Sequence, residues 1–527
     1  MANLTVTDAV VLALYLAVVL GAAIVFSVRQ RSTDDYYVAG RRLRSGWVAL
    51  SILATQVSAI SLLGAPAFVA VQAEGGLRWL QYELAVPLAM IALIAVIAPV
   101  LRRGRFVTIY EYIGTRFGPG PRAVLAATFL LARGLASGVA LYAVALPVAV
   151  TFELSLTIAM IAVGGFAILY TTVGGIEADV FSDVLQFVVL VAVTLVLVAV
   201  AVDGLGGWQA AFEAVPADRA RVLVWEQHGL GDGNTFALWP MLIGGFFLYV
   251  SYYGVDQSQA QRYLATPDVA AAQRALLLNG MTRFLVALLY CFLGLLLAGW
   301  IATQPDFAAA VMADRPDALV PIFVLEHAPA GVRGLFLAGL LAAAMSTLDS
   351  NYNSLSAVTL RDVLGWNEQD PRRLRAARTL TLGWGVFCTA ASFLFARSTS
   401  TVIETVNQIG SLFYGPVLGV FVLGMLFRRP GPYAALSGLG AGLAINATLW
   451  LSASGVSWLW WNVAGFLGSI GTGWAAGLMT LPSPRTDAER IQPLEQRLSL
   501  RASTALLLFA FAAMLVIAVI APRVFGV

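Results

Sequence analysis

Apolar stretches of about 20 residues recur along almost the whole chain, and this repetition limits what the chain can fold into. About fourteen such windows can be drawn, at 6–28, 46–72, 76–100, 121–151, 155–173, 178–202, 237–262, 270–303, 330–361, 372–397, 401–427, 431–453, 458–480 and 502–522. One apolar helix of that length crosses the hydrocarbon core of a bilayer. With 59% hydrophobic and 12% charged residues among 527, the chain carries more apolar surface than a soluble core buries. The sequence therefore predicts an all-α polytopic membrane protein with about 14 transmembrane helices.

The basic residues predict the orientation of these helices. All 32 are arginine, and if the N-terminus lies outside, 23 of them fall in inner loops. Because inner loops of membrane proteins are enriched in basic residues, we expect both termini outside. A chain without lysine and rich in Ala, Gly, Val and Arg is typical of a GC-rich bacterial genome, so we expect the bacterial cytoplasmic membrane.

Few residues offer catalytic or metal chemistry. Cys291 and Cys388 lie in apolar runs, and His228 and His327 have no acidic neighbours at metal-ligand spacing. We therefore expect no enzyme, no organic cofactor and no nucleic-acid partner, but contact with membrane lipid and a monomer or weak oligomer. Asp8 and the long run that follows it predict a retained first span rather than a signal peptide.

The segments between the spans are mostly short. The outer stretches 203–236 and 304–329 carry enough apolar residues for short helices on the surface, acting either as lids or as plain connectors. The inner stretch 482–501 mixes Arg, Asp and Glu and predicts a solvated linker.

Polar residues interrupt the 330–361 span. It contains LAAAMSTLDSNYNSLSAVTLR, and helical spacing puts Ala343, Ser346, Thr347, Ser350 and Ser354 along one side. Polar faces within a membrane are costly and usually mark a path for an ion or a substrate. This face is either a cation-binding surface or a polar contact between helices.

Two spans carry signs of a break. In the 46–72 span, the polar run 54–61 leads into Gly64 and Pro66, and in the 237–262 span YVSYYG occupies 249–254. Unwound backbone at membrane depth is tolerated where it lines a site. Because each break opens a block of five spans, the two blocks can form an inverted repeat.

Motifs in matching order resemble the sodium/solute symporter family. Gly174 and Gly175 are followed by Asp183, three residues before Gln186, which is a pattern of that family. Further matching segments are 108–117, 170–186, 257–262, 342–362 and 410–428. The resemblance implies sodium-coupled symport of a small polar organic solute, such as a sugar, polyol, organic acid or vitamin, by alternating access.

The resemblance also implies a LeuT-type fold of five plus five helices in one transmembrane domain, 1–527. The expected parts are an extra helix at 6–28, a first repeat at 46–202, a second repeat at 237–427 and three extra helices at 431–522. By the same resemblance, the first sodium site comprises Ala54, Val57, Ala343, Ser346 and Thr347. Small hard cations favour such backbone and hydroxyl oxygens.

Some family members hold a second sodium ion, and the matching positions here are Asp183, Ser346, Asp349 and Ser350. Asp349 departs from the serine or alanine expected there. Two carboxylates at low dielectric repel unless a cation or proton lies between them, so we expect a second cation site of unusual negative charge, with one or two sodium ions in all. The alternative is that Asp349 turns toward inner solvent or a nearby arginine.

For the solute, the family places the ligand beside the two breaks. The corresponding positions are Gln56, Ser61, Glu83, Tyr249, Tyr252 and Asn407, with Tyr252 where a sugar-transporting relative has an aromatic inner gate. Arg133 is a further candidate that pairs either with a solute carboxylate or with Glu83.

Three other functions compete with sodium symport. A proton-coupled or exchange transporter of the same fold would use Asp183 and Asp349. A sensory membrane module would carry a soluble output domain, which is not evident before Val527. A membrane-embedded enzyme would need catalytic spacing that the chain does not offer.

Overall fold

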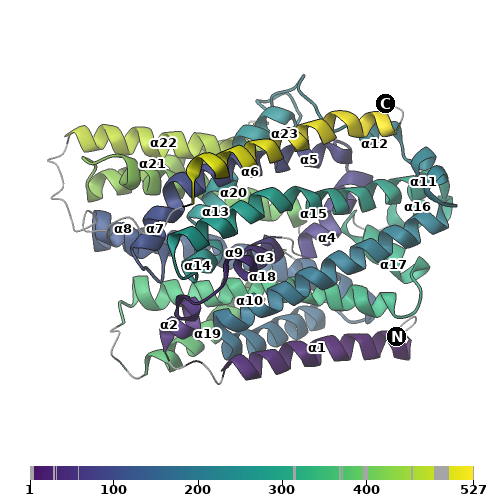
Figure 1. Ribbon diagram of the computed structural model, residues 1–527, viewed down its shortest axis with the longest axis horizontal. Coiled ribbons are helices and arrows are strands. Elements are labelled where there is room, and N and C mark those ends of the chain that lie inside the picture. The colour runs from purple at the N-terminus through teal and green to yellow at the C-terminus, as the bar shows by residue number, and fades with distance from the viewer. Residues whose placement is uncertain are drawn as a thin grey trace.

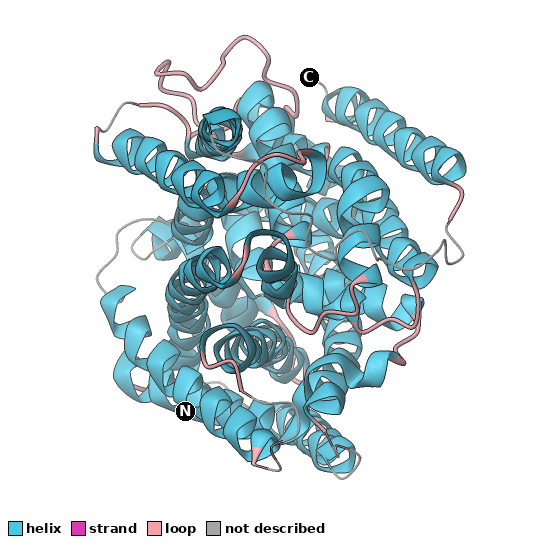
Figure 2. Ribbon diagram, turned by 90° about the vertical axis from the view of Figure 1, so that its left-hand side faces the viewer, coloured by secondary structure: helices cyan, strands magenta, loops and turns pink. Residues whose placement is uncertain are grey.

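The computed structural model describes residues 5–27, 30, 32–56, 59–312, 316–366, 370, 372–395, 402–452, 455–479 and 498–525, and helices dominate these ranges (Figures 1 and 2). The first part of the chain forms α1 (Val6–Ser27), α2 (Thr33–Val38), α3 (Ser45–Gln56), α4 (Ala59–Ala70), α5 (Leu80–Glu83), α6 (Ala85–Ala92), α7 (Ala98–Arg103), α8 (Ile109–Phe117), α9 (Pro119–Thr151), α10 (Leu156–Gly204), α11 (Trp208–Ala214) and α12 (Ala217–Ala220). The second part forms α13 (Gly245–Gly254), α14 (Gln257–Leu264), α15 (Val269–Thr303), α16 (Pro305–Met312), α17 (Leu319–His327), α18 (Val332–Val358), α19 (Arg373–Phe395), α20 (Val402–Leu426), α21 (Pro432–Leu451), α22 (Trp458–Met479) and α23 (Leu500–Val524).

The prediction of a helical protein that crosses the membrane several times is confirmed. Among the described residues, nine helices are long and apolar enough to cross a membrane, or ten if the bent pair α3–α4 is one span. The total of about fourteen transmembrane helices and the arrangement of ten of them as two repeats of five stay predictions. Both termini lie at the same end of the bundle, and α2, α7 and α8 lie at the opposite end (Figure 1).

Helix α10 contains a sharp break. Its 49 residues would span about 73 Å if straight, more than twice the thickness of a bilayer core. At Gly175, φ is +59° and ψ is −175°, a conformation that leaves the helix and strongly favours glycine. The two halves of α10 coincide with the predicted windows 155–173 and 178–202.

The predicted break in the 46–72 span is confirmed. Helix α3 ends at Gln56, α4 begins at Ala59, and the two helix axes differ by 53°. The run 54–61 explains the break, because its hydroxyl and amide side chains compete for backbone hydrogen bonds, whereas Pro66 lies within α4.

The second break lies beyond the residues predicted for it. Residues 249–254 are helical in α13, and the chain leaves the helix at Val255 and Asp256 before α14 begins. The Asp256 carboxylate accepts hydrogen bonds from the Ser258 backbone N–H (2.9 Å) and hydroxyl (2.6 Å), which caps α14. The cap, rather than the tyrosine-rich sequence, therefore determines where the helix is interrupted.

Helix α18 lies inside the bundle (Figure 1), in contact with α1, α9 and α10, and its side chains bond to Thr171 in the first half of α10 and to Asp183 in the second. Its side chains at Ser346, Asp349, Ser350 and Ser354 are buried. The stretches 203–236 and 304–329 contain the expected short helices, α11 and α12 in the first and α16 and α17 in the second. Helix α17 packs on α4 and α18, next to the broken span.

Substituting Gly175→Ala tests the break in α10. A Cβ atom at this position would lie 2.8 Å from Gln30 Nε2 and 2.9 Å from Tyr36 Cδ2, on a backbone that L-residues rarely adopt. We expect a loss of about 1–3 kcal/mol in stability, measured as a lower unfolding midpoint of the purified protein in detergent. Gly165→Ala, in the same helix with open space around it, is the control. Equal midpoints for both variants would contradict the assigned break.

Candidate functional site

A cavity of about 120 Å³ lies where the two interrupted helices meet. Six of the seven residues predicted to bind the solute line it: Gln56, Ser61, Arg133, Tyr249, Tyr252 and Asn407. The seventh, Glu83, lines a smaller neighbouring cavity together with Ser61 and Arg283. Sequence reasoning missed Arg283, Trp79, Tyr414 and Asn351, which also line one or both of these cavities.

A buried ion pair joins Glu83 on α5 to Arg283 on α15. Arg283 donates from Nε to Oε2 (2.9 Å) and from Nη2 to Oε1 (3.0 Å), and the Tyr249 hydroxyl donates to Oε1 (3.3 Å). The suggested pairing of Arg133 with Glu83 is therefore wrong, because Glu83 already holds Arg283. The buried Arg283 Nη1 atom has no hydrogen-bond partner within the part of the chain that the structure describes.

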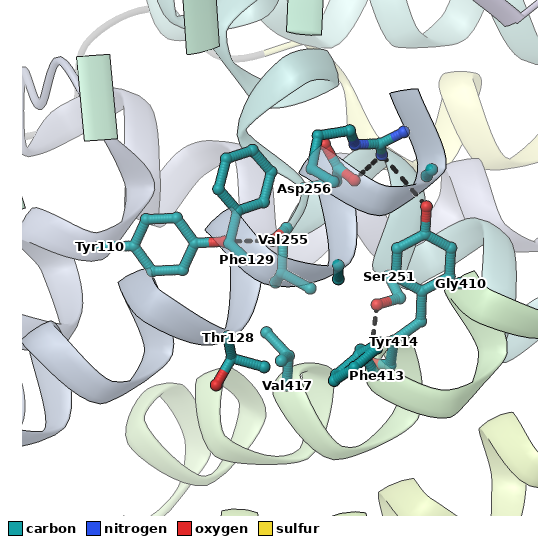
Figure 3. Close-up of a pocket in the computed structure, with 13 residues that line it drawn as sticks. Tyr110, Thr128, Phe129, Ser251, Val255, Asp256, Gly410, Phe413, Tyr414 and Val417 are labelled. Carbon is teal, nitrogen blue, oxygen red and sulfur yellow. Dashed lines mark hydrogen bonds and ion pairs between the residues drawn. The ribbon is translucent and has the colours of Figure 1, made fainter. Parts of the chain in front are cut away.

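Arg133 pairs instead with Asp256, the cap of α14, and donates to the Tyr414 hydroxyl at 3.1 Å (Figure 3). Its guanidinium also lies 5.5 Å from the centre of the Tyr252 ring. These contacts connect α9, α14 and α20 at the second helix break. A third cavity, of about 30 Å³ and lined by Tyr110, Phe129 and other residues, lies beside the ion pair (Figure 3).

Four of the five residues predicted for the first sodium site lie in the described part of α3 and α18. Ala54 and Ala343 are buried on α3 and α18, whereas Val57 lies outside the described residues. Thr347 lines the large cavity, and its hydroxyl donates to the Ala343 carbonyl at 3.3 Å. The Ser346 hydroxyl donates to Asp183.

Asp183 is the centre of a buried polar cluster that contains an arginine. Its Oδ2 atom accepts from Arg262 Nη2 (2.9 Å) and from the Ser51 hydroxyl, and its Oδ1 accepts from Ser346. The Arg262 side chain is fully buried and also approaches Asp179, with 3.5 Å between Nη2 and Oδ2. The hydroxyl of Ser350, a predicted cation ligand, contacts both Asp179 and Arg262.

Sequence reasoning missed Arg262 and Asp179. Arg262 ends the 237–262 window, and hydropathy alone assigns such a residue to the inner loop. The signals that could have found both were the family segments 170–186 and 257–262, which contain them.

Asp349 has a different environment from Asp183. Its Oδ1 atom accepts a hydrogen bond from the hydroxyl of Thr171 on the first half of α10, and its buried Oδ2 has no hydrogen-bond partner among the described residues. The alternative that Asp349 turns to solvent is wrong, because only 1% of the residue is exposed. Among the described residues, the two carboxylates share no hydrogen-bond partner, and no group of three or more acidic, His or Cys side chains converges on one metal position.

The buried acidic side chains in this region outnumber the buried arginines. The buried acids around the cavity and the cluster are Glu83, Asp179, Asp183, Asp256 and Asp349, and the buried arginines are Arg133, Arg262 and Arg283. Arg283 pairs with Glu83, and Arg133 pairs with Asp256. Arg262 alone is left to balance the carboxylates of Asp179, Asp183 and Asp349. If all three are ionised, two negative charges remain in a region of low dielectric. Uncompensated buried charges are costly, so this region favours cations or protons.

Comparison with known proteins agrees with the family resemblance seen in the sequence. A family model described as the Sodium:solute symporter family matches residues 36–442. The sodium/sialic acid symporter NanT of Aliivibrio fischeri is 28% identical over 93% of this chain and 96% of its own length. The human sodium/iodide cotransporter is 30% identical over 80% of this chain and 65% of its own length.

Two solved structures share the fold. A Na⁺-coupled sialic acid symporter in a substrate-bound outward-open state superimposes with a TM-score of 0.83 at 21% identity, covering 91% of this chain and 99% of the other. The nucleobase-cation-symport-1 family transporter Mhp1 superimposes with a TM-score of 0.54 at 13% identity, covering 87% of this chain and 98% of its own.

Arg262→Gln tests the buried cluster. Removing the guanidinium leaves Asp183 and Asp179 unpaired in the interior, and breaking such a pair costs about 3–5 kcal/mol. We expect a lower unfolding midpoint in choline chloride, and partial recovery when Asp179→Asn is added. The control is Arg274→Gln, because Arg274 is exposed on α15. An Arg262→Gln protein that unfolds like the control would show that the cluster contributes no stability.

Proposed function

Because the chain belongs to the sodium:solute symporter family, we propose that it carries a small polar organic solute into the cell together with sodium, by alternating access. One observation carries this proposal. The cavity between the helix breaks adjoins the polar face of α18, where Thr347 lines the cavity and the preceding Ser346 bonds to Asp183. A solute and a cation bound at these two places would be neighbours, which allows one conformational change to move both.

For the coupling ion, we propose a first sodium site formed by Ala54, Val57, Ala343, Ser346 and Thr347. The burial of Ser346 beside the negatively charged cluster supports a cation there. A second cation would bind near Asp183 and Ser350, where Arg262 already supplies one positive charge. Sodium suits both places because it is a hard cation that binds oxygen ligands.

For the solute, the lining of the large cavity favours an anionic group. Arg133 and Arg283 line it, and no carboxylate is among its lining residues in the described chain. Their partners Asp256 and Glu83 line the neighbouring cavities instead. We therefore favour an organic acid or a vitamin with a carboxylate over a neutral sugar or polyol. Relatives are named as carriers of sialic acid, iodide and monocarboxylates, which are anions.

For the orientation, we propose that the end of the bundle with α2, α7 and α8 faces the cytoplasm. Arg41, Arg102, Arg116 and Arg122 lie in or beside these helices, and the positive-inside rule assigns such an end to the inner side. Both termini would then be periplasmic, and Tyr252, beside the Arg133–Asp256 pair, would close the inner side of the cavity.

The proposal is tested by uptake into proteoliposomes. Sialic acid, lactate, pantothenate and glucose are offered with an inward sodium gradient, with choline in place of sodium, and with a pH gradient in sodium-free medium. A potential of about 100 mV contributes about 2.3 kcal/mol per charge, and a tenfold gradient about 1.4 kcal/mol. Each ion could therefore support accumulation of several hundredfold. Accumulation that is equal in choline would overturn sodium coupling, and accumulation driven by the pH gradient would favour a proton.

Thr347→Ala tests the first sodium site. Loss of one hydroxyl ligand should raise the sodium concentration for half-maximal uptake about tenfold, which corresponds to about 1.4 kcal/mol. The matched control is Thr448→Ala on α21, whose exposed hydroxyl bonds to the Ala444 carbonyl in its own helix. A sodium dependence identical to that of the control would remove Thr347 from the site.

A further inference from the structure

An open groove of about 590 Å³ runs between α3 and α15, lined by residues different from those of the large cavity. Its apolar wall and far end are formed by Trp47, Leu50 and Leu53 from α3 and by Leu278 and Thr282 from α15. Trp47 and Leu278 are each 42% exposed, so apolar side chains face the surroundings of the protein here. From Ser45 to Leu53 the groove follows α3 for about 12 Å, which is most of the ~15 Å that the hydrocarbon of one leaflet occupies.

One end of the groove is positively charged. Arg44 lines the groove directly before α3, and Arg274 lies one helical turn before Leu278 on the same face of α15. Both arginines are exposed, and neither is in an ion pair within the part of the chain that the structure describes. The nearby Arg42, by contrast, pairs with Asp35. The groove therefore combines an apolar wall with two uncompensated guanidinium groups at one end.

Small residues leave space at this end. Ser45 and Gly46 follow Arg44 in the lining, and a Cβ atom at Gly46 would meet no neighbouring atom within 4 Å. The next residue, Trp47, stacks on Phe181 of α10, with 6.2 Å between the ring centres. Tryptophan is enriched where a membrane meets water. A polar headgroup therefore has room beside Arg44, next to an indole ring suited to that depth.

Hydrogen bonds place the basic end of the groove at the end of the bundle that contains α7. The Leu43 N–H donates to the Ala265 carbonyl (3.1 Å), which ties the chain before α3 to the chain before α15. Arg102 on α7 donates from Nε to the Thr266 carbonyl (2.9 Å). Since this end is proposed to face the cytoplasm, the two exposed arginines would lie among the headgroups of the inner leaflet. Anionic lipids give that leaflet its negative surface, and basic pockets between helices on this side bind their headgroups.

We propose that this groove binds one anionic phospholipid, with its phosphate between Arg44 and Arg274 and an acyl chain along the apolar wall. An anionic lipid fits better than a zwitterionic one, because its charge compensates guanidinium groups that have no carboxylate partner in the described chain. Helix α3 also carries Ser51, which bonds to Asp183 and Arg262, so the lipid would hold the helix that supports the buried cluster. The inner-leaflet location rests on the proposed orientation, whereas the charge of the headgroup does not.

Thermal unfolding of the purified full chain in detergent, without sodium or solute, tests this site. Phosphatidylglycerol should raise the unfolding midpoint in a saturable way, and phosphatidylcholine with the same acyl chains should not. An arginine near an anionic membrane surface contributes about fivefold in affinity, so Arg44→Gln combined with Arg274→Gln should raise the half-saturating concentration of phosphatidylglycerol about 25-fold. The matched control is Arg375→Gln combined with Arg501→Gln, which removes two exposed arginines from α19 and α23. Each shift is measured from the same variant's midpoint without lipid.

A second pair of variants tests the apolar part of the groove. Leu278→Trp fills space between α3 and α15 while both arginines remain, so it should weaken the response to phosphatidylglycerol about tenfold, which corresponds to about 1.4 kcal/mol. The control is Leu285→Trp, because Leu285 is 59% exposed on the same helix and outside the lining of the groove. Equal responses of these two variants would show that no acyl chain lies in the groove.

Other outcomes would also overturn the proposal. Equal midpoint shifts with phosphatidylglycerol and phosphatidylcholine would do so, as would a double arginine variant that responds like its control. A shift with glycerol 3-phosphate as large as that with phosphatidylglycerol would identify a site for free phosphate rather than for lipid. Because these measurements contain no sodium, a failure of sodium-driven uptake in proteoliposomes would overturn sodium coupling and leave the lipid site standing.

Discussion

The structure depends on one buried arginine shared between carboxylates. Arg262 lies between Asp183 and Asp179, and it reaches Ser51 on the broken α3 and Ser350 on α18. A charge this deep is tolerated only with partners, so its own helix α14 and the three elements that it contacts, α3, α10 and α18, must stay together. Because a single guanidinium cannot balance Asp179, Asp183 and Asp349, the same interaction that holds the elements together leaves negative charge for cations or protons to compensate.

The cavity next to the Arg262 cluster lies where the two helices are interrupted. The bend between α3 and α4 and the Asp256 cap before α14 both interrupt helices inside the bundle. Arg133 and Arg283 turn toward the cavity, while their carboxylate partners lie in adjoining cavities. A region of excess carboxylate beside α18 therefore lies next to a cavity lined by two ion-paired guanidinium groups.

Much of this could be predicted from the sequence, and the failures have physical causes. Hydropathy and the polar run 54–61 predicted the helices and the first break, because both are local properties. The family resemblance placed six of its seven predicted solute residues in the lining of the cavity, although other lining residues, such as Trp79 and Arg283, were missed. Ion pairing could not be predicted, because whether Arg133 meets Glu83 or Asp256 depends on how separate helices rotate and approach. Arg262 was missed because a charged residue at the end of an apolar window looks like a loop residue.

The central claim is that cations compensate the carboxylates beside α18, and thermal unfolding tests it most directly. The unfolding midpoint of the purified protein is measured as sodium chloride replaces choline chloride at constant ionic strength. Since a ligand that binds the folded state stabilises it, the account predicts a midpoint that rises steadily with sodium concentration. A midpoint that is the same in both salts would contradict it.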